Sequence, residues 1–348
     1  MDPCRGLRRV LLVQLRNMGD VLLCTPAVRA LKQACPEAQL DFLTGATGAH
    51  ALNGSLHLAE VLVWPAERGA RWRMLRELRR RKYDAVLDFQ SHPRTCWIAW
   101  TTRAPRRIGI RKRGPRNLAY THLVPRVSTE VYQPRQKLAL LSPLGVTVDP
   151  ATADVRLEAA VGEPERARAD EIFARHGLMG DHLVVAVSAV SKLPVKQWGA
   201  ERWAVVADVL ADAGARVLLT SGPGERAQAE AVARRMRHPA VWDYGSTTIP
   251  ELAALYERCA LWAGNDGGAL HVAAAAGIPT LCIIHHGMGP TWSDTSQGSL
   301  HRYLEGAEPT ADGRGGIDAL TPAEVTAAAL DIFETTMRRG AGSLALER

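Results

Sequence analysis

Short apolar segments alternate with polar or amphipathic segments along almost the whole chain, and this alternation limits the possible folds more than any other feature. The first apolar segment, RVLLVQL at 9–15, has the compact Val and Leu content of a strand buried on both faces of a parallel sheet. A polar loop follows, and then a helix predicted over 21–34, in which Pro26 is expected to tilt or re-start the helix. Repeated strand and helix in this order predict an α/β fold with a doubly wound parallel sheet.

The alternation occurs in two series, separated by a polar and alanine-rich stretch at 150–180. At 348 residues the chain is long enough for two domains, each with its own core. We expect an N-terminal domain over 1–160, a C-terminal domain over 180–320, a C-terminal helix over 321–339 and a flexible tail over 340–348. The predicted strands are 9–15, 39–43, 59–63, 83–88, 182–187, 215–220, 241–244 and 281–284.

Positive charge is concentrated in the first half of the chain. Residues 1–150 carry 25 Lys and Arg against 11 Asp and Glu, whereas residues 151–348 carry 18 against 25. The net charge of +7 is therefore the sum of about +14 in the first half and −7 in the second. This asymmetry predicts an acidic partner for the first half, such as a nucleic acid, an anionic lipid surface or a phosphorylated sugar. A solvated basic surface without a partner remains the alternative.

The sequence contains no predicted membrane span, because no apolar run approaches the roughly twenty residues that a spanning helix needs. The apolar run near the N-terminus is interrupted by Arg16, Asn17 and Asp20, so we interpret it as a strand and not as a signal peptide. The six cysteines show no C-x-x-C spacing. Together these features predict a cytoplasmic protein without a transmembrane segment.

A glycine-rich stretch, WAGNDGGALHVAAAAG at 262–277, predicts the end of a strand, a tight turn and a helix. We expect Asp266 to cap this helix, and Gly267 and Gly268 to leave the first backbone N–H groups uncovered. A helix start of this kind binds phosphate, because its free N–H groups and its dipole both favour an anion, and His271 lies one turn further on. An ordinary buried helix with a glycine-rich entry is the alternative.

The loop after the first strand, 16–20, falls at the carboxyl end of that strand, where ligands bind in open α/β sheets. It lacks the G-x-G-x-x-G pattern, so a dinucleotide site is disfavoured. Asp20 in this loop either acts on a ligand or only caps the following helix.

A dense basic cluster follows the helix predicted around Trp97. Such a density of cations packs poorly and holds anions well. Its members are Arg103, Arg106, Arg107, Arg111, Lys112, Arg113 and Arg116.

Four motifs, each at a strand-to-helix loop, resemble those of the ADP-heptose:lipopolysaccharide heptosyltransferase family. They are MGDVL at 18–22, KQW at 196–198, GPGE at 222–225 and GNDGGALH at 264–271, and RRIG at 106–109 and LALLSPLG at 138–145 also look like stretches of this family. The resemblance runs from about residue 9 to 285. It implies a GT-B fold, in which two Rossmann-like domains face each other across a cleft. It also implies a metal-independent enzyme without a cofactor that transfers heptose with inversion from ADP-heptose to the inner core of lipopolysaccharide. The partners it implies are this nucleotide sugar and an anionic glycolipid at the inner face of the cytoplasmic membrane, on which the protein would be peripheral.

The same resemblance implies roles for individual residues. Asp20 matches the catalytic base, and Lys196 matches the lysine that faces the phosphates and stabilises the leaving diphosphate. The donor-binding residues that it implies are Ser188, Lys196, Gly222, Glu225, Asp266, Gly267, Gly268 and His271. For Glu225, a purely structural place in the first turn of a helix is an equal alternative. The basic first half supplies the expected acceptor-binding residues, which are Arg16, Arg94, Arg103, Arg106, Arg107, Arg111 and Arg113.

Two positions depart from the family pattern. Gly267 stands where many relatives carry Ser or Thr, so a backbone N–H must serve in place of a hydroxyl. The turn His285-His286-Gly287 replaces a Phe-Gly-Pro-like turn, which leaves the donor's base and sugar less defined. The adjacent histidines are not expected to bind a metal, since consecutive residues rarely face one ion and no carboxylate stands beside them in the sequence.

The sequence is also compatible with two other functions. A related glycosyltransferase could use another nucleotide sugar, or a protein or small-molecule acceptor. A non-catalytic nucleic-acid binder would need aromatic residues among the arginines, and none lies between Arg103 and Arg116. We therefore expect no nucleic-acid partner.

Overall fold

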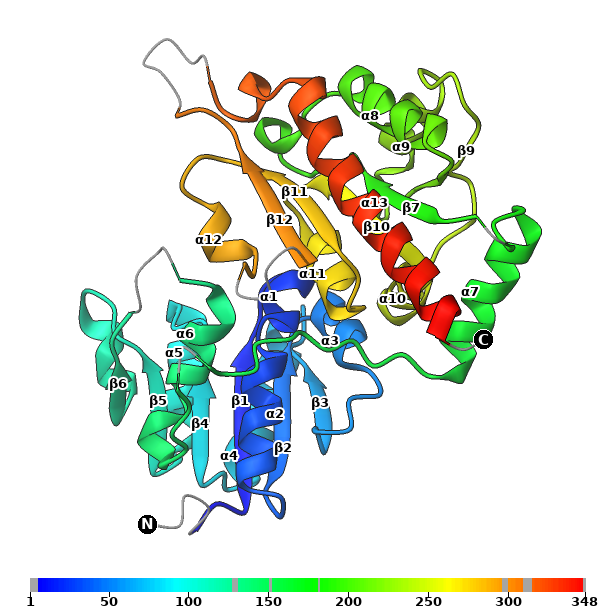
Figure 1. Cartoon of the computed structure of the whole chain (residues 1–348). Helices are drawn as coiled ribbons and strands as arrows, with labels where there is room; N and C mark the ends of the chain where they lie inside the picture. The colour runs from blue at the N-terminus through cyan, green and yellow to red at the C-terminus, as the bar shows by residue number, and fades with distance from the viewer. Residues whose placement is uncertain are drawn as a thin grey trace. The chain divides into compact units, whose positions relative to one another are not determined.

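A computed structural model of the chain describes residues 6–126, 131–149, 152–180, 182–295, 300–308 and 315–346. The chain divides into two compact units, Met1–Ala160 and Val161–Arg348. Each unit contains a six-stranded sheet in which every strand pairs in parallel with its neighbours, with helices around it (Figure 1). The predicted α/β class with two parallel sheets is therefore confirmed.

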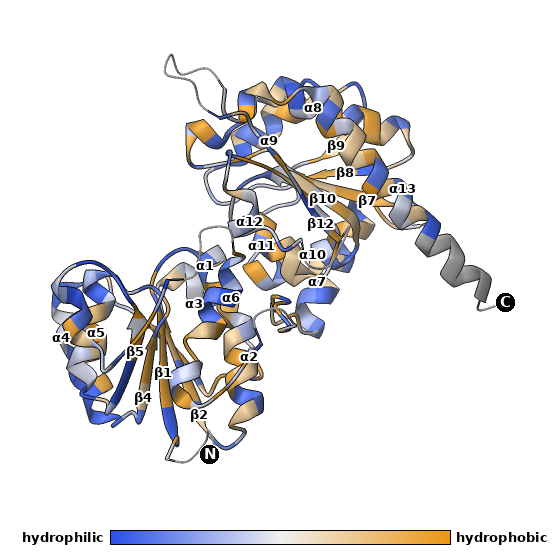
Figure 2. Cartoon of the chain, turned by 60° about the vertical axis from the view of Figure 1, so that its left-hand side comes forward, coloured by the Kyte–Doolittle hydropathy of each residue, from blue (hydrophilic) through white to orange (hydrophobic). Residues whose placement is uncertain are grey.

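The first unit is built on the strand order β3-β2-β1-β4-β5-β6. Its strands are β1 (Arg9–Gln14), β2 (Gln39–Thr44), β3 (Glu60–Val63), β4 (Ala85–Asp88), β5 (Arg106–Ile110) and β6 (His122–Val124). Its helices are α1 (Met18–Leu22), α2 (Thr25–Ala34), α3 (Ala46–Leu52), α4 (Arg68–Arg80), α5 (Pro93–Thr102) and α6 (Gln133–Ala139), with short 3₁₀ turns η1 (Pro115–Ala119) and η2 (Ser142–Leu144). Helices α4 and α5 cover one face of the sheet and α2 and α6 the other (Figure 2).

Pro26 divides the helix predicted over 21–34 into two. It occupies the first turn of α2, where its missing N–H costs nothing, and α1 ends just before it. The predicted re-start at this proline is confirmed. Strands β5 and β6 lie in segments that the sequence did not indicate as strands, because arginines dominate the start of β5 and β6 is short.

The second unit repeats the same architecture with the order β12-β11-β10-β7-β8-β9. Its strands are β7 (Val184–Ser188), β8 (Arg216–Leu219), β9 (Ala240–Val241), β10 (Cys259–Asn265), β11 (Thr280–Ile284) and β12 (His301–Glu305). Its helical elements are α7 (Glu163–Arg175), η3 (Pro194–Lys196), α8 (Ala200–Asp212), α9 (Arg226–Ala233), α10 (Ile249–Glu257), α11 (Gly268–Ala275), α12 (Gly289–Trp292), η5 (Ile317–Ala319) and α13 (Pro322–Leu346).

Two features of the second unit differ from the prediction. Strand β12 was not predicted, because its sequence, HRYLE, lacks an apolar run. Helix α13 ends at Leu346 and not within the range 321–339 that the sequence suggested.

The two strand orders are equivalent, since each sheet runs outward in both directions from its first strand. In such a sheet the direction of winding reverses between the first and fourth strands, and the crevice at their carboxyl ends is the usual ligand site. In the first unit the reversal lies between β1 and β4, and in the second between β7 and β10. These two places are where functional loops are expected.

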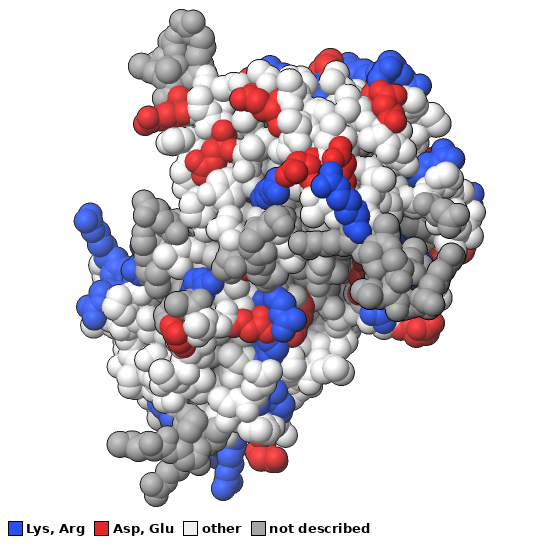
Figure 3. Space-filling view, viewed as in Figure 1, with Lys and Arg blue, Asp and Glu red and all other residues white. Residues whose placement is uncertain are grey.

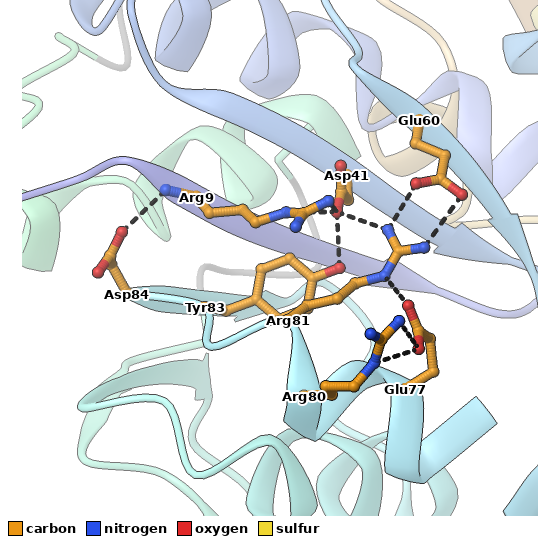
Figure 4. Close-up of polar contacts among 8 residues, drawn as sticks. All are labelled: Arg9, Asp41, Glu60, Glu77, Arg80, Arg81, Tyr83 and Asp84. Carbon is orange, nitrogen blue, oxygen red and sulfur yellow. Dashed lines mark hydrogen bonds and ion pairs between the residues drawn. The ribbon is translucent and has the colours of Figure 1, made fainter. Parts of the chain in front are cut away.

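At the amino ends of the strands of the first unit, a charged network joins β1, β2, β3 and α4 (Figure 4). The fully buried carboxylate of Asp41 accepts hydrogen bonds from Arg9, Arg81 and Tyr83 at 3.1, 3.1 and 2.7 Å. Arg81 also donates to Glu60 and Glu77. Its hydrogen bonds lower the pKa of Glu60, and hydrogen bonds from Arg80 and then Arg81 lower the pKa of Glu77. Because the Asp41 carboxylate is shielded from water, loss of a donor such as Arg81 would cost more stability than loss of an exposed ion pair.

No helix in the described part of the chain is long and apolar enough to cross a membrane. Among the described cysteines, Cys24, Cys96, Cys259 and Cys282 are free and buried. Cys35 forms a disulfide, a pairing that the spacing of the cysteines in the sequence did not indicate.

Arg81→Ala is expected to lower the free energy of unfolding of the first unit by about 2–3 kcal/mol, because it leaves a buried carboxylate with fewer donors. Arg80→Ala is the matched control, since the Arg80 side chain is 78% exposed whereas that of Arg81 is 13% exposed. Urea unfolding followed by circular dichroism compares the two variants. Equal unfolding midpoints would show that the network does not stabilise the sheet.

Candidate functional site

In the second unit, strands β7 and β10 end side by side, with Ser188 paired opposite Gly264. A Cβ atom on Gly264 would lie 2.6 Å from the carbonyl oxygen of Ser188 and 2.7 Å from the ring of Trp262. Only glycine allows so close an approach. The loops that follow the two strands therefore start from adjacent positions, and Ser188 is buried there.

Asn265, the last residue of β10, fixes these loops in place. Its side-chain amide donates to the carbonyl oxygen of Ala189 (2.8 Å), and its Oδ1 accepts the indole N–H of Trp203 from α8 (3.0 Å). One buried amide thus joins β10, the loop after β7 and a helix on the sheet. Sequence reasoning named Asn265 only as part of a motif and missed this role.

The helix α11 begins at Gly268, with Gly267 as its N-cap residue in an extended conformation. The prediction that Asp266 caps this helix is wrong, because no side chain caps it and the Asp266 carboxylate forms an ion pair with Lys196. The cation on the neighbouring loop attracts the carboxylate more strongly than the backbone N–H groups do. The first-turn N–H groups are consequently not covered by a capping side chain.

Lys196 ends the short turn η3, which lies in the loop after β7. Two glutamines hold this loop: Gln197 donates to the carbonyl oxygen of Ser191 (2.7 Å), and Gln228 of α9 accepts the N–H of Ser191 (3.2 Å). The structure therefore brings together Ser188, Lys196, Asp266 and the start of α11 in one unit. A cation and uncovered backbone donors at one place form an anion-binding site.

His271 lies one turn into α11, is buried, and has its ring centroid 6.1 Å from that of Trp292. The turn that follows β8, the strand next to β7, is closed by Glu225. The Glu225 carboxylate accepts the N–H of Gly222 at 3.0 Å. Glu225 is the residue before α9, so it holds this turn together whatever else it contacts.

The turn after β11 contains His285 and His286 and is organised by Glu305 at the end of β12. The Glu305 carboxylate accepts the N–H groups of Gly287 (3.0 Å) and Gly289 (2.8 Å) and lies 3.8 Å from Nδ1 of His286. The sequence placed no carboxylate beside the histidines, and the structure corrects this, because β12 is adjacent to β11. Within the described ranges, no group of three or more His, Cys, Asp or Glu is arranged to hold a metal ion.

In the first unit, the loop after β1 leads into α1, and Asp20 lies half-buried in the first turn of that helix. The Gln90 side chain accepts the N–H of Leu15 at 3.0 Å, so it ties this loop to the loop after β4. Asp88, at the end of β4, accepts the N–H groups of Gln90 and Ser91 and the hydroxyl of Tyr120. Burial raises the pKa of Asp88, against the effect of these hydrogen bonds, which stabilise its charge. At the carboxyl ends of these strands, Asp20 is therefore partly accessible, whereas Asp88 is buried and holds the loop after β4 through its hydrogen bonds.

A group of cations surrounds the same edge of the first unit. The pKa of His92 is lowered by burial and then by the positive charges of Arg16, Lys112 and Arg116. The pKa of Lys112 is lowered in the same way, by burial and by its cationic neighbours. Sequence reasoning did not propose His92, and it listed Lys112 and Arg116 only as part of the basic cluster. Lys and Arg side chains also project from the first unit near β6 in Figure 3.

The predicted acceptor-binding arginines divide between the two ends of the first sheet. Arg16, Arg94, Arg111 and Arg113 are exposed and lie on loops or a helix start at the carboxyl ends of the strands. The remaining three lie at the amino ends, about 13 Å away along β5. They are Arg103, Arg106 and Arg107.

Arg107 is also already engaged, since its guanidinium donates to the carbonyl oxygens of Ala119 and Ala104, both at 2.7 Å. The sequence cluster 103–116 is therefore not one site. A strand, β5, runs through its middle and separates its members.

Two units, each with a doubly wound parallel sheet whose winding reverses between its first and fourth strands, have the GT-B architecture of glycosyltransferases. The chain belongs to glycosyltransferase family 9 (heptosyltransferase), whose model matches residues 71–286. The matched range includes Lys196 and Asp266 but not the loop with Asp20.

Relatives agree with this assignment. Lipopolysaccharide heptosyltransferase 3 of Escherichia coli (strain K12) is 26% identical over 284 residues, which cover 77% of this chain and 80% of that protein. The crystal structure of a family 9 glycosyl transferase from Veillonella parvula matches with a TM-score of 0.82 at 23% identity, covering 96% of this chain and 99% of the other. The structure of the E. coli ADP-heptose lipopolysaccharide heptosyltransferase II matches with a TM-score of 0.74 at 18% identity, covering 94% and 99%.

Gly264→Ala is expected to destabilise the second unit by about 2 kcal/mol, because the added methyl group overlaps the backbone of β7. The matched variant Gly267→Ala should change stability by less than about 0.5 kcal/mol, since its Cβ would meet nothing nearer than the carbonyl oxygen of Asn265 at 3.8 Å. Urea unfolding of both variants makes the comparison. If Gly264→Ala unfolds like the wild type, the close approach of β7 and β10 is not a requirement of this fold.

Proposed function

We propose that this glycosyltransferase moves heptose from ADP-L-glycero-D-manno-heptose to the inner core of lipopolysaccharide with inversion at the anomeric carbon. The observation that carries the proposal is the pairing of Lys196 with Asp266 beside the uncapped start of α11, because a diphosphate needs this combination of cation and backbone donors. Support for the donor comes from the E. coli relative described as an ADP-heptose lipopolysaccharide heptosyltransferase.

In this proposal the second unit binds the donor. The Lys196 ammonium group, paired with Asp266, also donates to the diphosphate. The N–H groups of Gly267, Gly268 and Ala269 donate to phosphate oxygens. Ser188 and His271 are further donors to the same group, and Glu225 contacts the ribose from its turn with Gly222. Because negative charge grows on the leaving diphosphate as the glycosidic bond breaks, these fixed donors stabilise the transition state more than the ground state.

The first unit binds the acceptor and supplies the base. Asp20 accepts the proton of an acceptor hydroxyl, the hydroxyl oxygen bonds to the anomeric carbon, and the bond from that carbon to the diphosphate oxygen breaks on the opposite face. The products are the glycoside, protonated Asp20 and ADP, so no oxidant, metal or cofactor is needed to balance the step. The Asp20 side chain is half-buried, so an acceptor hydroxyl can reach its carboxylate while the surrounding chain holds it in place.

The acceptor is proposed to be an anionic glycolipid at the inner face of the cytoplasmic membrane, to which the enzyme binds peripherally. Its phosphates and carboxylates would contact the cations at the carboxyl edge of the first sheet. These are Arg16, Arg94, Arg111 and Arg113 from the sequence, with His92, Lys112 and Arg116 added by the structure. Arg103, Arg106 and Arg107 are left out, because they lie at the other edge.

A transfer assay tests the proposal directly. Purified enzyme is incubated with ADP-heptose and a lipid A acceptor carrying its keto-sugar residues, and the products are measured by mass spectrometry. The expected result is a mass increase of one heptose on this acceptor. Transfer only to a protein or small molecule, or only from another nucleotide sugar, would replace the proposed substrates.

Asp20→Ala should lower kcat by at least ~100-fold because it removes the proposed general base. ADP affinity, measured by calorimetry, should stay within about twofold, because the donor residues belong to the other unit. Asp20→Asn keeps the size of the side chain and should be as inactive as Asp20→Ala. An active Asp20→Asn enzyme would remove Asp20 from the role of base.

Lys196→Ala should weaken ADP binding and lower kcat together, each by about tenfold or more, since Lys196 faces the diphosphate in both ground and transition states. Lys192→Ala, an exposed lysine in the same loop, is the matched control and should bind ADP as the wild type does. Calorimetry with ADP and initial-rate kinetics make the comparison. An unchanged Kd for ADP in Lys196→Ala would refute the assignment.

A further inference from the structure

Three of the nine tryptophans lie exposed on one side of the first unit. Trp72 on α4 is 58% exposed, and Trp97 and Trp100 on α5 are 40% and 58% exposed. The other tryptophans are buried or half-buried. Leu118 in η1 is 81% exposed. We call these four side chains the tryptophan face.

The tryptophan face is one continuous surface. The rings of Trp72 and Trp97 meet edge to face with centroids 5.3 Å apart. Trp97 and Trp100 are three residues apart on α5 and share one side of the helix. Together with Leu118 and Arg116 they line an open hollow of about 500 Å³ between α5 and η1. Helices α4 and α5 lie side by side on the same face of the sheet (Figure 2).

Arginines border this apolar surface. On α4, Arg68 and Arg76 lie one turn to either side of Trp72, and both are exposed. On α5, Arg94 lies one turn before Trp97 and is also exposed. From Phe89 to Thr129 the sequence contains no Asp or Glu. Of the two acids on or next to α4, Glu77 is paired with Arg80 and Arg81, and Glu67 directly precedes Arg68. Arginines outnumber them on this helix. The surroundings of the tryptophan face are therefore positively charged.

Apolar rings with polar N–H groups, bordered by arginines, are complementary to the interface of an anionic bilayer. Tryptophan prefers the level of the lipid headgroups, and each Arg or Lys near the surface adds electrostatic attraction to anionic lipids. A second copy of the chain in a two-fold arrangement would place the same basic surface against itself, so like charges would oppose it. A nucleic acid would need rings free to stack, but Trp72 and Trp97 are already packed against each other.

We propose that the tryptophan face is a membrane-docking surface that seats the first unit on an anionic phospholipid bilayer. Trp72, Trp100 and Leu118 enter the boundary between headgroups and acyl chains, and the bordering arginines contact lipid phosphates. The proposal rests on the proposed function and deepens it, because Arg94 belongs both to this border and to the acceptor-binding edge. Docking would thus hold the acceptor edge at the surface from which a glycolipid headgroup projects.

Vesicle co-sedimentation tests the proposal with the full chain, in the absence of donor and acceptor. Wild-type protein should bind vesicles of phosphatidylglycerol and phosphatidylethanolamine, and bind phosphatidylcholine vesicles at least about tenfold more weakly. The double variant Trp72→Ser/Trp100→Ser should lose about tenfold or more in affinity for the anionic vesicles. Val205→Ser/Met337→Ser is the matched control, since these side chains are 48% and 43% exposed in the second unit, and it should bind as the wild type does.

The double variant Arg68→Glu/Arg76→Glu separates charge from apolar insertion. It should lose binding to the anionic vesicles by about tenfold or more, with little change on phosphatidylcholine. Circular dichroism confirms that each variant is folded. Wild-type binding by the tryptophan variant would overturn the proposal. So would a loss of self-association in sedimentation, or of RNA binding, without a loss of vesicle binding, since the occupant would then be a second copy or a nucleic acid.

A kinetic comparison keeps this inference apart from the proposed function. On a deacylated, water-soluble acceptor the tryptophan variant should transfer heptose at the wild-type rate, whereas on acceptor embedded in vesicles its rate should fall by about tenfold. Vesicle binding without any transfer to either acceptor would overturn the proposed substrate and leave the docking surface standing. Equal rates of wild type and variant on embedded acceptor would reject docking and leave the substrate standing.

Discussion

The proposed donor site depends on how closely β10 ends beside β7. Gly264 lets the two backbones meet, and Asn265 then connects the end of β10 to the next loop and to Trp203 of α8. As a result, the loop that carries Lys196 and the start of α11 are joined through Asn265. An anion site made of backbone N–H groups and one cation is effective only if those donors are held before the ligand arrives, because otherwise binding must supply their ordering. The residues proposed to bind the donor therefore differ from the buried residues Gly264, Asn265 and Trp203, which hold them in position.

The pairing of Lys196 with Asp266 has a consequence for specificity. Without a ligand, the carboxylate satisfies the cation, so a partly buried charge is not left alone. A weak anion gains little by displacing a carboxylate, whereas a diphosphate, with more charge and more acceptor oxygens, gains much more from the same donors. Glu225 follows a similar pattern at the neighbouring turn, where its carboxylate already accepts a backbone N–H. The proposed donor site would therefore discriminate among ligands, because each ligand group must replace an interaction that the protein makes by itself.

The sequence predicted the α/β class, most central strands and the strand-to-helix loops that carry Asp20, Lys196 and Gly267, because these depend on local apolar patterns and on glycine. It failed where residues distant in the chain decide the outcome. Asp266 was expected to cap α11, but a lysine seventy residues away attracts it. Glu305 lies beside His286 only because β12 pairs with β11, and β12 has no apolar run to reveal it. The arginines at 103–116 are close in sequence, yet Arg106 and Arg111 lie at opposite ends of strand β5. Local patterns thus locate the elements, whereas pairing between elements decides which polar groups meet.

The stabilising network and the proposed acceptor site lie at opposite ends of the strands of the first sheet. At the amino ends, Asp41 is buried with Arg9, Arg81 and Tyr83, and its charge is matched within the protein. At the carboxyl ends, cations gather around His92 with no comparable set of carboxylates, and burial with mutual repulsion lowers the pKa values of His92 and Lys112. Like charges held together cost stability, and an anionic ligand would relieve that cost on binding. The charge-matched network at the amino ends stabilises the same strands and leaves free the carboxyl ends, where the acceptor is proposed to bind. A parallel sheet suits this division because every strand contributes one end to each task.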